Sequence, residues 1–259
     1  RYFAPVSAAL HSGESFEQSI RMGYRAILCS PRFLLFPAPA GKLDSYALAS
    51  RLSYFLWNRM PDQELFELAA QGRLEDNSVL HQQVERLLNH PNGQKFASAF
   101  AAEWLDLRLI AFTQPDPKLY PGFDPIVEHS MLAETHAFLE HLIQDNRPVG
   151  ELIDAKYTFL NSHLAAFYGI KNVNGGDIQK VSLLPQDHRG GILTHGSVLK
   201  VTANGTQTSP VTRGTWISER ILGIEIPPPP ANVPAIEPDT RGASTIREQL
   251  QKHQNDPTC

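Results

Sequence analysis

The stretch FDPIVEHSMLAETHAFLEHLIQD, residues 123–145, predicts the longest helix of the chain and decides its fold class. Asp124 can cap this helix, and Pro125 suits its first position. One face carries Val127, Met131, Glu134, Phe138 and Leu142, which are spaced by 4, 3, 4 and 4 residues. This spacing is that of the buried stripe of a helix, so we expect Glu134 to point into the core.

The same combination of capping residues and apolar periodicity recurs along most of the chain. It predicts helices over residues 45–57, 60–74, 77–91, 93–110, 161–170, 208–223 and 244–253. Strand signals are few, and we expect short strands or extended loops over residues 177–184 and 192–203. The segment IPPPPANVPAIEP, residues 226–238, is typical of an extended polyproline arm.

These patterns predict a mainly α fold. A bundle-like helical region is followed by a smaller irregular region with short extended segments and the Pro-rich arm. We divide the chain into an N-terminal helical segment (1–40), a helical domain (41–175) and a smaller C-terminal region (176–259). The last boundary is placed where KNVNGGD interrupts the run of helices.

Composition narrows the classes of partner. The 259 residues are 42% hydrophobic and carry a net charge of −4, with no basic run. A nucleic acid is therefore not expected as a partner. No apolar stretch approaches the roughly 18 residues that a membrane span requires, so we expect no integral membrane segment. No signal peptide is visible, which leaves the compartment open.

Two carboxylates and one arginine stand on predicted apolar stripes. Glu103 shares its stripe with Phe96, Phe100 and Leu107, and Arg51 lies on the stripe of helix 45–57. Buried charges need partners. The functional interpretation is that Glu103 and Glu134 act as an acid–base or metal-binding pair. The structural interpretation, which we favour, is an internal ion pair with Arg51 that orients the helices.

A glycine-rich stretch at residues 190–210 carries the last candidate side chain, His195. Its glycines allow close backbone approach, and His195 could serve as a ligand or a base. The alternative is a plain glycine-rich connection before a capped helix. His129, His136 and His141 in the long helix are interpreted as surface residues, and no metal site is predicted.

The chain contains two cysteines, Cys29 and Cys259. Cys29 lies in an apolar setting that favours a free buried thiol. A single disulfide between Cys29 and Cys259 is the alternative, and it would close a very long loop.

Several stretches together resemble the large exported cytochrome-like proteins of planctomycetes and related bacteria, which are mosaics of several domains of uncharacterised function. The matching stretches follow in the expected order over residues 26 to 259. They include LASRLSYFLWNRMPD (48–62), DAKYTFLNSHLAAFYGI (154–170), RGGILTHGSVLKVTANGTQTSPVTRGTWISERILG (189–223) and REQLQKHQNDPTC (247–259).

The resemblance implies a cofactor. In that family the segment ending in Cys continues as Cys-x-x-Cys-His, the attachment motif of haem c. Cys259 matches the first haem-attaching position, while the second cysteine and the ligating histidine are not in this sequence. His195, Glu103, Glu134 and Arg51 could then line a pocket beside the haem.

The leading hypothesis is that this chain is the non-haem portion of an exported, periplasmic or extracellular c-type cytochrome-like protein. Its role would be electron transfer, or oxidation of an extracellular substrate at an adjacent haem. The partner would be a redox protein or haem module, and a small-molecule or glycan substrate is compatible. Two alternatives stay open: a structural or carbohydrate-binding module, and a hydrolase that uses the buried carboxylates. The sequence leaves open whether the chain is itself an enzyme, such as a haem-dependent oxidoreductase.

Overall fold

The computed structural model describes residues 2–35, 41–206 and 208–227, together with 245, 247, 248 and 251. Contacts divide the chain into two compact units, Arg1–Thr208 and Ser209–Cys259. The expected Pro-rich arm and final helix lie almost entirely outside the described residues, as does Cys259.

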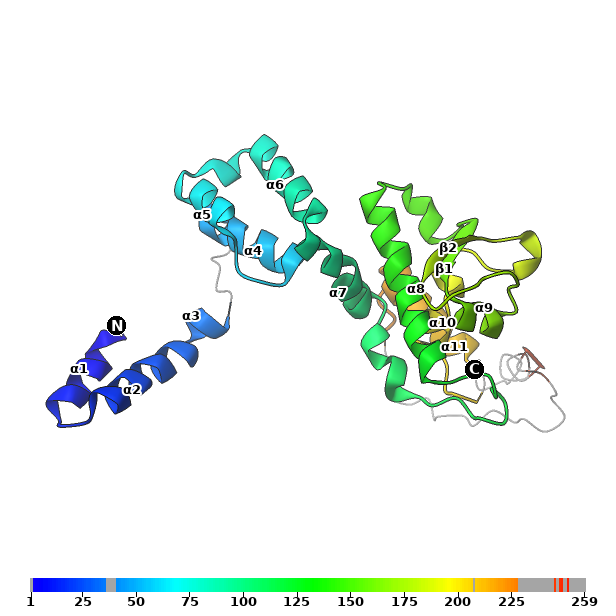
Figure 1. Cartoon of the computed structure of the whole chain (residues 1–259), viewed down its shortest axis with the longest axis horizontal. Helices are drawn as coiled ribbons and strands as arrows, with labels where there is room; N and C mark the ends of the chain where they lie inside the picture. Colours follow the sequence, from blue (N-terminus) through cyan, green and yellow to red (C-terminus); the bar gives the residue numbers. More distant parts are fainter. Residues whose placement is uncertain are drawn as a thin grey trace. The chain divides into compact units, whose positions relative to one another are not determined.

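Helices dominate the described part of the chain, which confirms the mainly α fold (Figure 1). The α-helices are α1 (Phe3–His11), α2 (Phe16–Leu28), α3 (Pro31–Leu34), α4 (Ser45–Trp57), α5 (Gln63–Ala70), α6 (Asn77–Asn89), α7 (Gln94–Trp104), α8 (Pro125–Gln144), α9 (Ser162–Tyr168), α10 (Gly196–Val201) and α11 (Pro210–Trp216). Short 3-10 helices are η1 (Arg73–Glu75), η2 (Pro91–Gly93), η3 (Leu107–Phe112), η4 (Val149–Leu152), η5 (Pro185–Asp187) and η6 (Ile192–Thr194), and α11 continues as the π-helical turn η7 (Ile217–Ile221). None of the described helices is long and apolar enough to cross a bilayer.

Side chains cap several helices, and the cap expected at Asp124 is among them. The side chains of Asp44, Asp76, Asp124, Asn161 and Ser209 each accept a hydrogen bond from a backbone N–H in the first turn of their helix. These bonds satisfy amide groups that a helix leaves without an internal partner.

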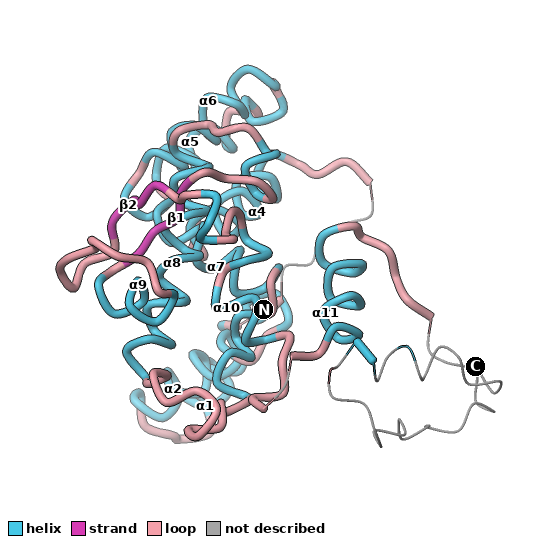
Figure 2. The backbone as a smooth tube through the Cα atoms, turned by 90° about the vertical axis from the view of Figure 1, so that its right-hand side faces the viewer, coloured by secondary structure: helices cyan, strands magenta, loops and turns pink. Residues whose placement is uncertain are grey.

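Two strands occur in the described residues, β1 (Tyr157–Leu160) and β2 (Gln179–Ser182). They pair antiparallel, with Tyr157 opposite Ser182 and Leu160 opposite Gln179. Figure 2 shows this two-stranded sheet beside α8 and α9. Strand β2 confirms the extended segment expected at 177–184. The expectation for residues 192–203 is wrong, because η6 and α10 occupy that segment.

One hydrophobic core is built by α4, α5, η1 and α6. Its fully buried members are Ala49, Leu65, Leu74 and Leu87. The indole Nε1 of Trp57 donates to the carbonyl oxygen of Leu87 at 2.8 Å, which ties α4 to α6.

A second core forms where α8 packs on β1 and α9. It contains Val127, Met131, Leu160, Leu164 and Ala165. The face of α8 that the sequence predicts to be buried therefore meets the strand and the short helix that follow it. This core encloses the candidate site.

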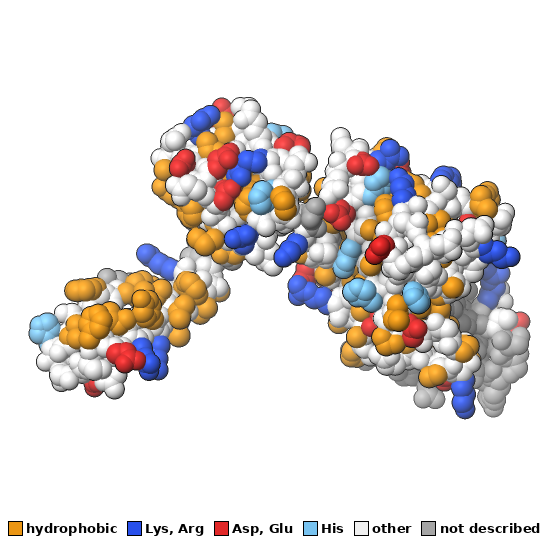
Figure 3. Space-filling model, in the orientation of Figure 1, with side chains coloured by type: hydrophobic (Ala, Val, Ile, Leu, Met, Phe, Trp, Pro, Cys, Tyr) orange, Lys and Arg blue, Asp and Glu red, His pale blue; other side chains and the backbone are white. Residues whose placement is uncertain are grey.

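Helices α1 and α2 have few apolar side chains in a core of their own. Among residues 2–35, Val6 and Ala9 are the buried hydrophobic residues. Phe3 and Phe16 are 78% and 70% exposed, and hydrophobic side chains gather over this segment in Figure 3.

Candidate functional site

Glu134 lies in the second core, as its spacing in the sequence predicts. Val127, Met131 and Phe138 from the same face of α8 are buried around it, and Glu134 itself is 1% exposed. A carboxylate removed from water this completely needs strong hydrogen-bond donors.

Two hydroxyl groups satisfy the carboxylate of Glu134. Thr158 Oγ1 of β1 donates to Oε1 at 2.6 Å, and Tyr168 OH at the end of α9 donates to Oε2 at 2.6 Å. Both oxygens of Glu134 are thus held by neighbouring elements of the fold. The partner of the buried carboxylate is a pair of hydroxyls, and the expected pairing with Arg51 is wrong.

Tyr168 extends the network towards residues 189–196. Its OH accepts a hydrogen bond from the backbone N–H of Gly196 at 2.7 Å. The guanidinium carbon of Arg189 lies 3.3 Å from the centre of the Tyr168 ring, in a cation–π contact. Burial, and then the charge of Glu134, raise the pKa of Tyr168 well above its usual value of 10. Tyr168 therefore keeps its proton and remains a donor to Glu134.

His195 is buried in the same region, directly before α10. It is 1% exposed, and its ring packs against Phe138 in a T-shaped arrangement with the ring centres 4.9 Å apart. Its Nδ1 lies 3.0 Å from Thr135 Oγ1, which in turn lies 2.7 Å from Ser197 Oγ. Its Nε2 is buried without a hydrogen-bond partner in the described structure. Burial lowers the pKa of His195, opposed in part by Glu134, so the imidazole is held neutral.

A second buried charge lies on α10. Lys200 is 8% exposed, and its Nζ lies 3.0 Å from Oε2 of Glu128 on α8. The same ammonium donates to the carbonyl oxygens of Ile110 and, at 2.7 Å, Thr113. Lys200 therefore joins α10 to α8 and to the end of η3.

The structure brings together two of the four candidate residues, Glu134 and His195. The expectation that Glu103 points inward is wrong: its side chain is 61% exposed and pairs with Arg108. Helix α7 instead buries Ala97 and Ala101, whose small side chains permit close packing. Glu103 is two residues beyond Ala101 and so faces the other way.

Arg51 is also exposed, against the expectation. Helix α4 buries Ala49, Ser53 and Leu56, a face rotated away from the stripe chosen from the sequence. Apolar residues surround much of α4, so their periodicity marks the buried face poorly.

The sequence analysis missed the partners of Glu134 and His195. The roles of Tyr168, Thr158 and Arg189 depend on tertiary contacts. These contacts form where β1, α9 and residues 189–196 pack near α8. One local signal was available: residues 157–159 are aromatic or β-branched, and Leu160 and the capping residue Asn161 follow, which is typical of a strand that ends at a helix cap.

Cys29 is a free thiol at the C-terminal end of α2, and it is exposed. The expectation of a buried thiol is therefore wrong, because the apolar residues around it also lie largely at the surface. Its pairing with Cys259 stays a prediction, since Cys259 lies outside the described residues.

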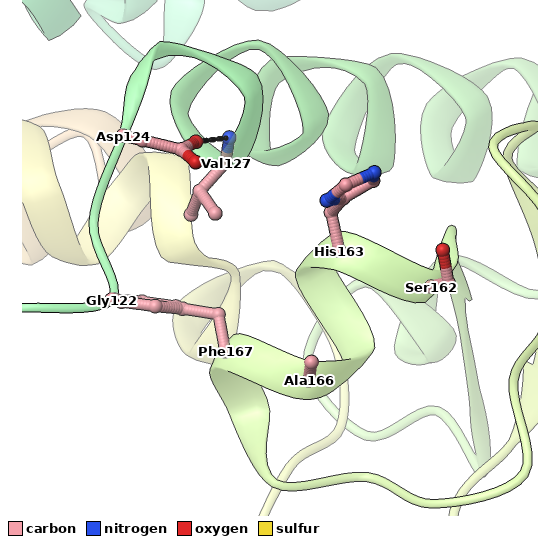
Figure 4. Close-up of a pocket in the computed structure, with 7 residues that line it drawn as sticks. All are labelled: Gly122, Asp124, Val127, Ser162, His163, Ala166 and Phe167. Atoms are coloured by element: carbon pink, nitrogen blue, oxygen red, sulfur yellow. Dashed lines mark hydrogen bonds between the residues drawn. The ribbon is translucent and has the colours of Figure 1, made fainter.

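An open cleft lies between the start of α8 and α9 (Figure 4). It has a volume of about 340 Å³ and is lined by Gly122, Asp124, Val127, Ser162, His163, Ala166 and Phe167. Although serine, histidine and aspartate all line it, Asp124 is engaged in capping α8 through the amide of Val127. In Figure 4 no hydrogen bond joins Ser162 to His163. The residues that line the cleft do not form the hydrogen-bonded series of a catalytic triad.

Two family models match this chain. Residues 43–170 match PSD4, described as a protein of unknown function (DUF1592). Residues 189–259 match PSCyt3, also described as a protein of unknown function (DUF1588). Both are families of the planctomycete cytochrome-like multidomain proteins, in agreement with the resemblance seen in the sequence. No curated protein and no solved structure gives a significant match.

The lowered pKa of His195 predicts a loss of stability in acid. Below the unfolded-state pKa of about 6.5, His195 binds a proton in the unfolded chain but stays neutral in the folded chain until the pH is lower. The free energy of unfolding should therefore fall as the pH drops below that value, by at most about 1.4 kcal/mol per pH unit for one proton. Urea unfolding at several pH values between 8 and 5 measures this slope.

His195→Asn should make the slope shallower. Burial is the main cause that lowers the pKa of His136, so this residue also reduces the free energy of unfolding in acid. Its share of the slope is measured separately in His136→Gln. An unaltered slope in His195→Asn would contradict this account.

The exposure of Cys29 makes a second prediction. In the native protein, a maleimide reagent should label Cys29 at a rate comparable to that in the unfolded chain. Peptide mapping by mass spectrometry locates the label. Protection of Cys29 that disappears on reduction would instead indicate a disulfide with Cys259.

Proposed function

We propose that this chain is the haem-free scaffold of an exported c-type cytochrome-like protein, in which Cys259 is the first haem-attaching residue. The match of residues 189–259 to PSCyt3 carries this proposal, because it extends to Cys259. The role of the whole protein would be redox: electron transfer, or oxidation of an extracellular substrate at the haem.

The described residues themselves do not fit a haem c site. Covalent attachment takes two thiols and a ligating histidine. Cys29 is the single cysteine among the described residues, and His195 is enclosed beside Phe138 and Thr135. No group of three His, Cys, Asp or Glu side chains that could hold a metal is found in the described ranges. A haem would therefore be held at Cys259 and by residues that follow it in the family pattern.

A scaffold role agrees with the geometry of the buried network. Both oxygens of Glu134 accept hydroxyl hydrogen bonds, and the residue is closed off from solvent. A general acid or base must reach its substrate. The hydrolase alternative loses support, since Glu134 is enclosed and Glu103 is an exposed residue paired with Arg108.

The cleft between α8 and α9 favours a second candidate, a carbohydrate-binding role. Its volume lies at the low end of ligand pockets, and it offers the Phe167 ring beside the polar groups of Ser162 and His163. A rise in melting temperature with a simple sugar, lost in Phe167→Ala, would support binding there. No shift at millimolar sugar would remove this candidate.

Two matched cysteine variants test the leading proposal. The natural polypeptide is produced in a bacterial periplasm with haem c maturation, and covalent haem is measured by the pyridine haemochrome spectrum. We expect Cys259→Ser to lose the spectrum of a haem held by two thioether bonds, while Cys29→Ser retains it. Absence of covalent haem in the unaltered protein, or its full retention in Cys259→Ser, would overturn the proposal.

A further inference from the structure

Residues 189–208 belong to the PSCyt3 match, but they contact residues of the PSD4 match. We infer that this first part of the PSCyt3 match is a permanent intramolecular partner of the PSD4 match, docked on the surface formed by η3, α8, α9 and residues 152–155. The two family segments would then share one fold, with residues 189–208 completing its core.

Hydrogen bonds and charge join the two segments at their centre. The amide of Gly196 donates to Tyr168 OH, which donates to Glu134. The guanidinium group of Arg189 lies over the ring of Tyr168. The buried carboxylate of the PSD4 segment thus belongs to a hydrogen-bond series that ends in the PSCyt3 segment.

Lys200 and Gly205 hold the far end of the docked segment. The buried ammonium of Lys200 is satisfied by Glu128 and by the carbonyl oxygens of η3 and Thr113, all from the earlier segment. The backbone N–H of Asp116 donates to the carbonyl oxygen of Gly205 at 2.9 Å. Without residues 189–208, Glu128 would lose its cationic partner.

Close backbone approach makes the two surfaces complementary in shape. A Cβ atom added to Gly190 would lie 2.7 Å from the carbonyl oxygen of Ala155, and one on Gly191 would lie 2.5 Å from that of Ile153. A Cβ on Gly196 would lie 2.5 Å from Tyr168 OH and 2.7 Å from Met131 Cγ. Glycine is required at these positions because any side chain would separate the surfaces.

A cut between the two segments tests the inference in the full chain. A protease site is inserted between Asp187 and His188, at the end of η5 and next to the exposed residue Gln186. After cleavage, we expect fragments 1–187 and 188–259 to elute together in native buffer and to separate only in denaturant. Separation in native buffer, with fragment 1–187 keeping the melting transition of the uncut protein, would overturn the inference.

Glycine variants of the cleaved protein provide a graded test. Gly196→Val should raise the dissociation constant of the two fragments by at least about tenfold, since the added atoms overpack the contact. Gly150→Ala is the matched control, because a Cβ at that position meets no atom within 4 Å. Equal fragment affinities in both variants would also contradict docking at this surface.

Discussion

Replacing Glu134 with alanine is expected to lower the free energy of unfolding by about 3–5 kcal/mol, because two charge-assisted hydrogen bonds are lost and a cavity forms. Thr158 and Tyr168 would each lose the acceptor that lies 2.6 Å from their hydroxyl oxygens. The loss would also loosen the contact with Gly196 through Tyr168. Guanidinium unfolding followed by circular dichroism measures the change.

Glu103→Ala is the matched control for this prediction. Its carboxylate is exposed and its partner Arg108 is a surface residue, so the change should stay within about 0.5 kcal/mol. Similar losses in the two variants would show that Glu134 is not the anchor of the buried network.

Replacing Lys200 with methionine is expected to lower the free energy of unfolding by about 2–4 kcal/mol, since it leaves a partly buried carboxylate without its cation. Methionine keeps much of the volume of the side chain, so the loss reports the ammonium group. Glu128 and the carbonyl oxygens of Ile110 and Thr113 would lose their shared donor. Lys156→Met, at a side chain that is 82% exposed, should change stability by no more than about 0.5 kcal/mol.

A double variant separates the ion pair from the other contacts of Lys200. Removing Glu128 as well, in Glu128→Gln with Lys200→Met, should cost less than the sum of the two single changes, because neither charge is then left alone. Strict additivity of the two changes would contradict a direct pairing of Lys200 with Glu128.

Local signals predicted the helices well. Asp124 and Pro125 mark the start of α8, and the stripe that includes Glu134 is buried as its spacing indicates. The prediction succeeded here because α8 packs through large apolar side chains with a clear period. In α4 and α7 the fully buried positions are Ala49, Ser53 and Ala101, whose small side chains carry little hydrophobic signal.

The site could be predicted only in part. Glu134 was visible as a carboxylate on an apolar stripe, and His195 as a histidine among glycines. Their grouping depends on contacts between distant segments, such as that of Gly196 with Tyr168. The same contacts explain why residues 192–203 form η6 and α10 in spite of their β-branched residues: α10 is held by Lys200 and the Gly196 amide, and local propensity is overridden.

Hydrogen exchange of the intact chain tests most directly whether residues 189–208 belong to the core around Glu134. The amides of Leu199 and Thr202, which donate to the carbonyl oxygens of His195 and Val198, report on α10. Amides in the middle of α8 report on the PSD4 segment. If the two segments open as one cooperative unit, both sets should exchange with the same free energy of opening. A value for α10 more than about 2 kcal/mol below that for α8 would contradict a shared core.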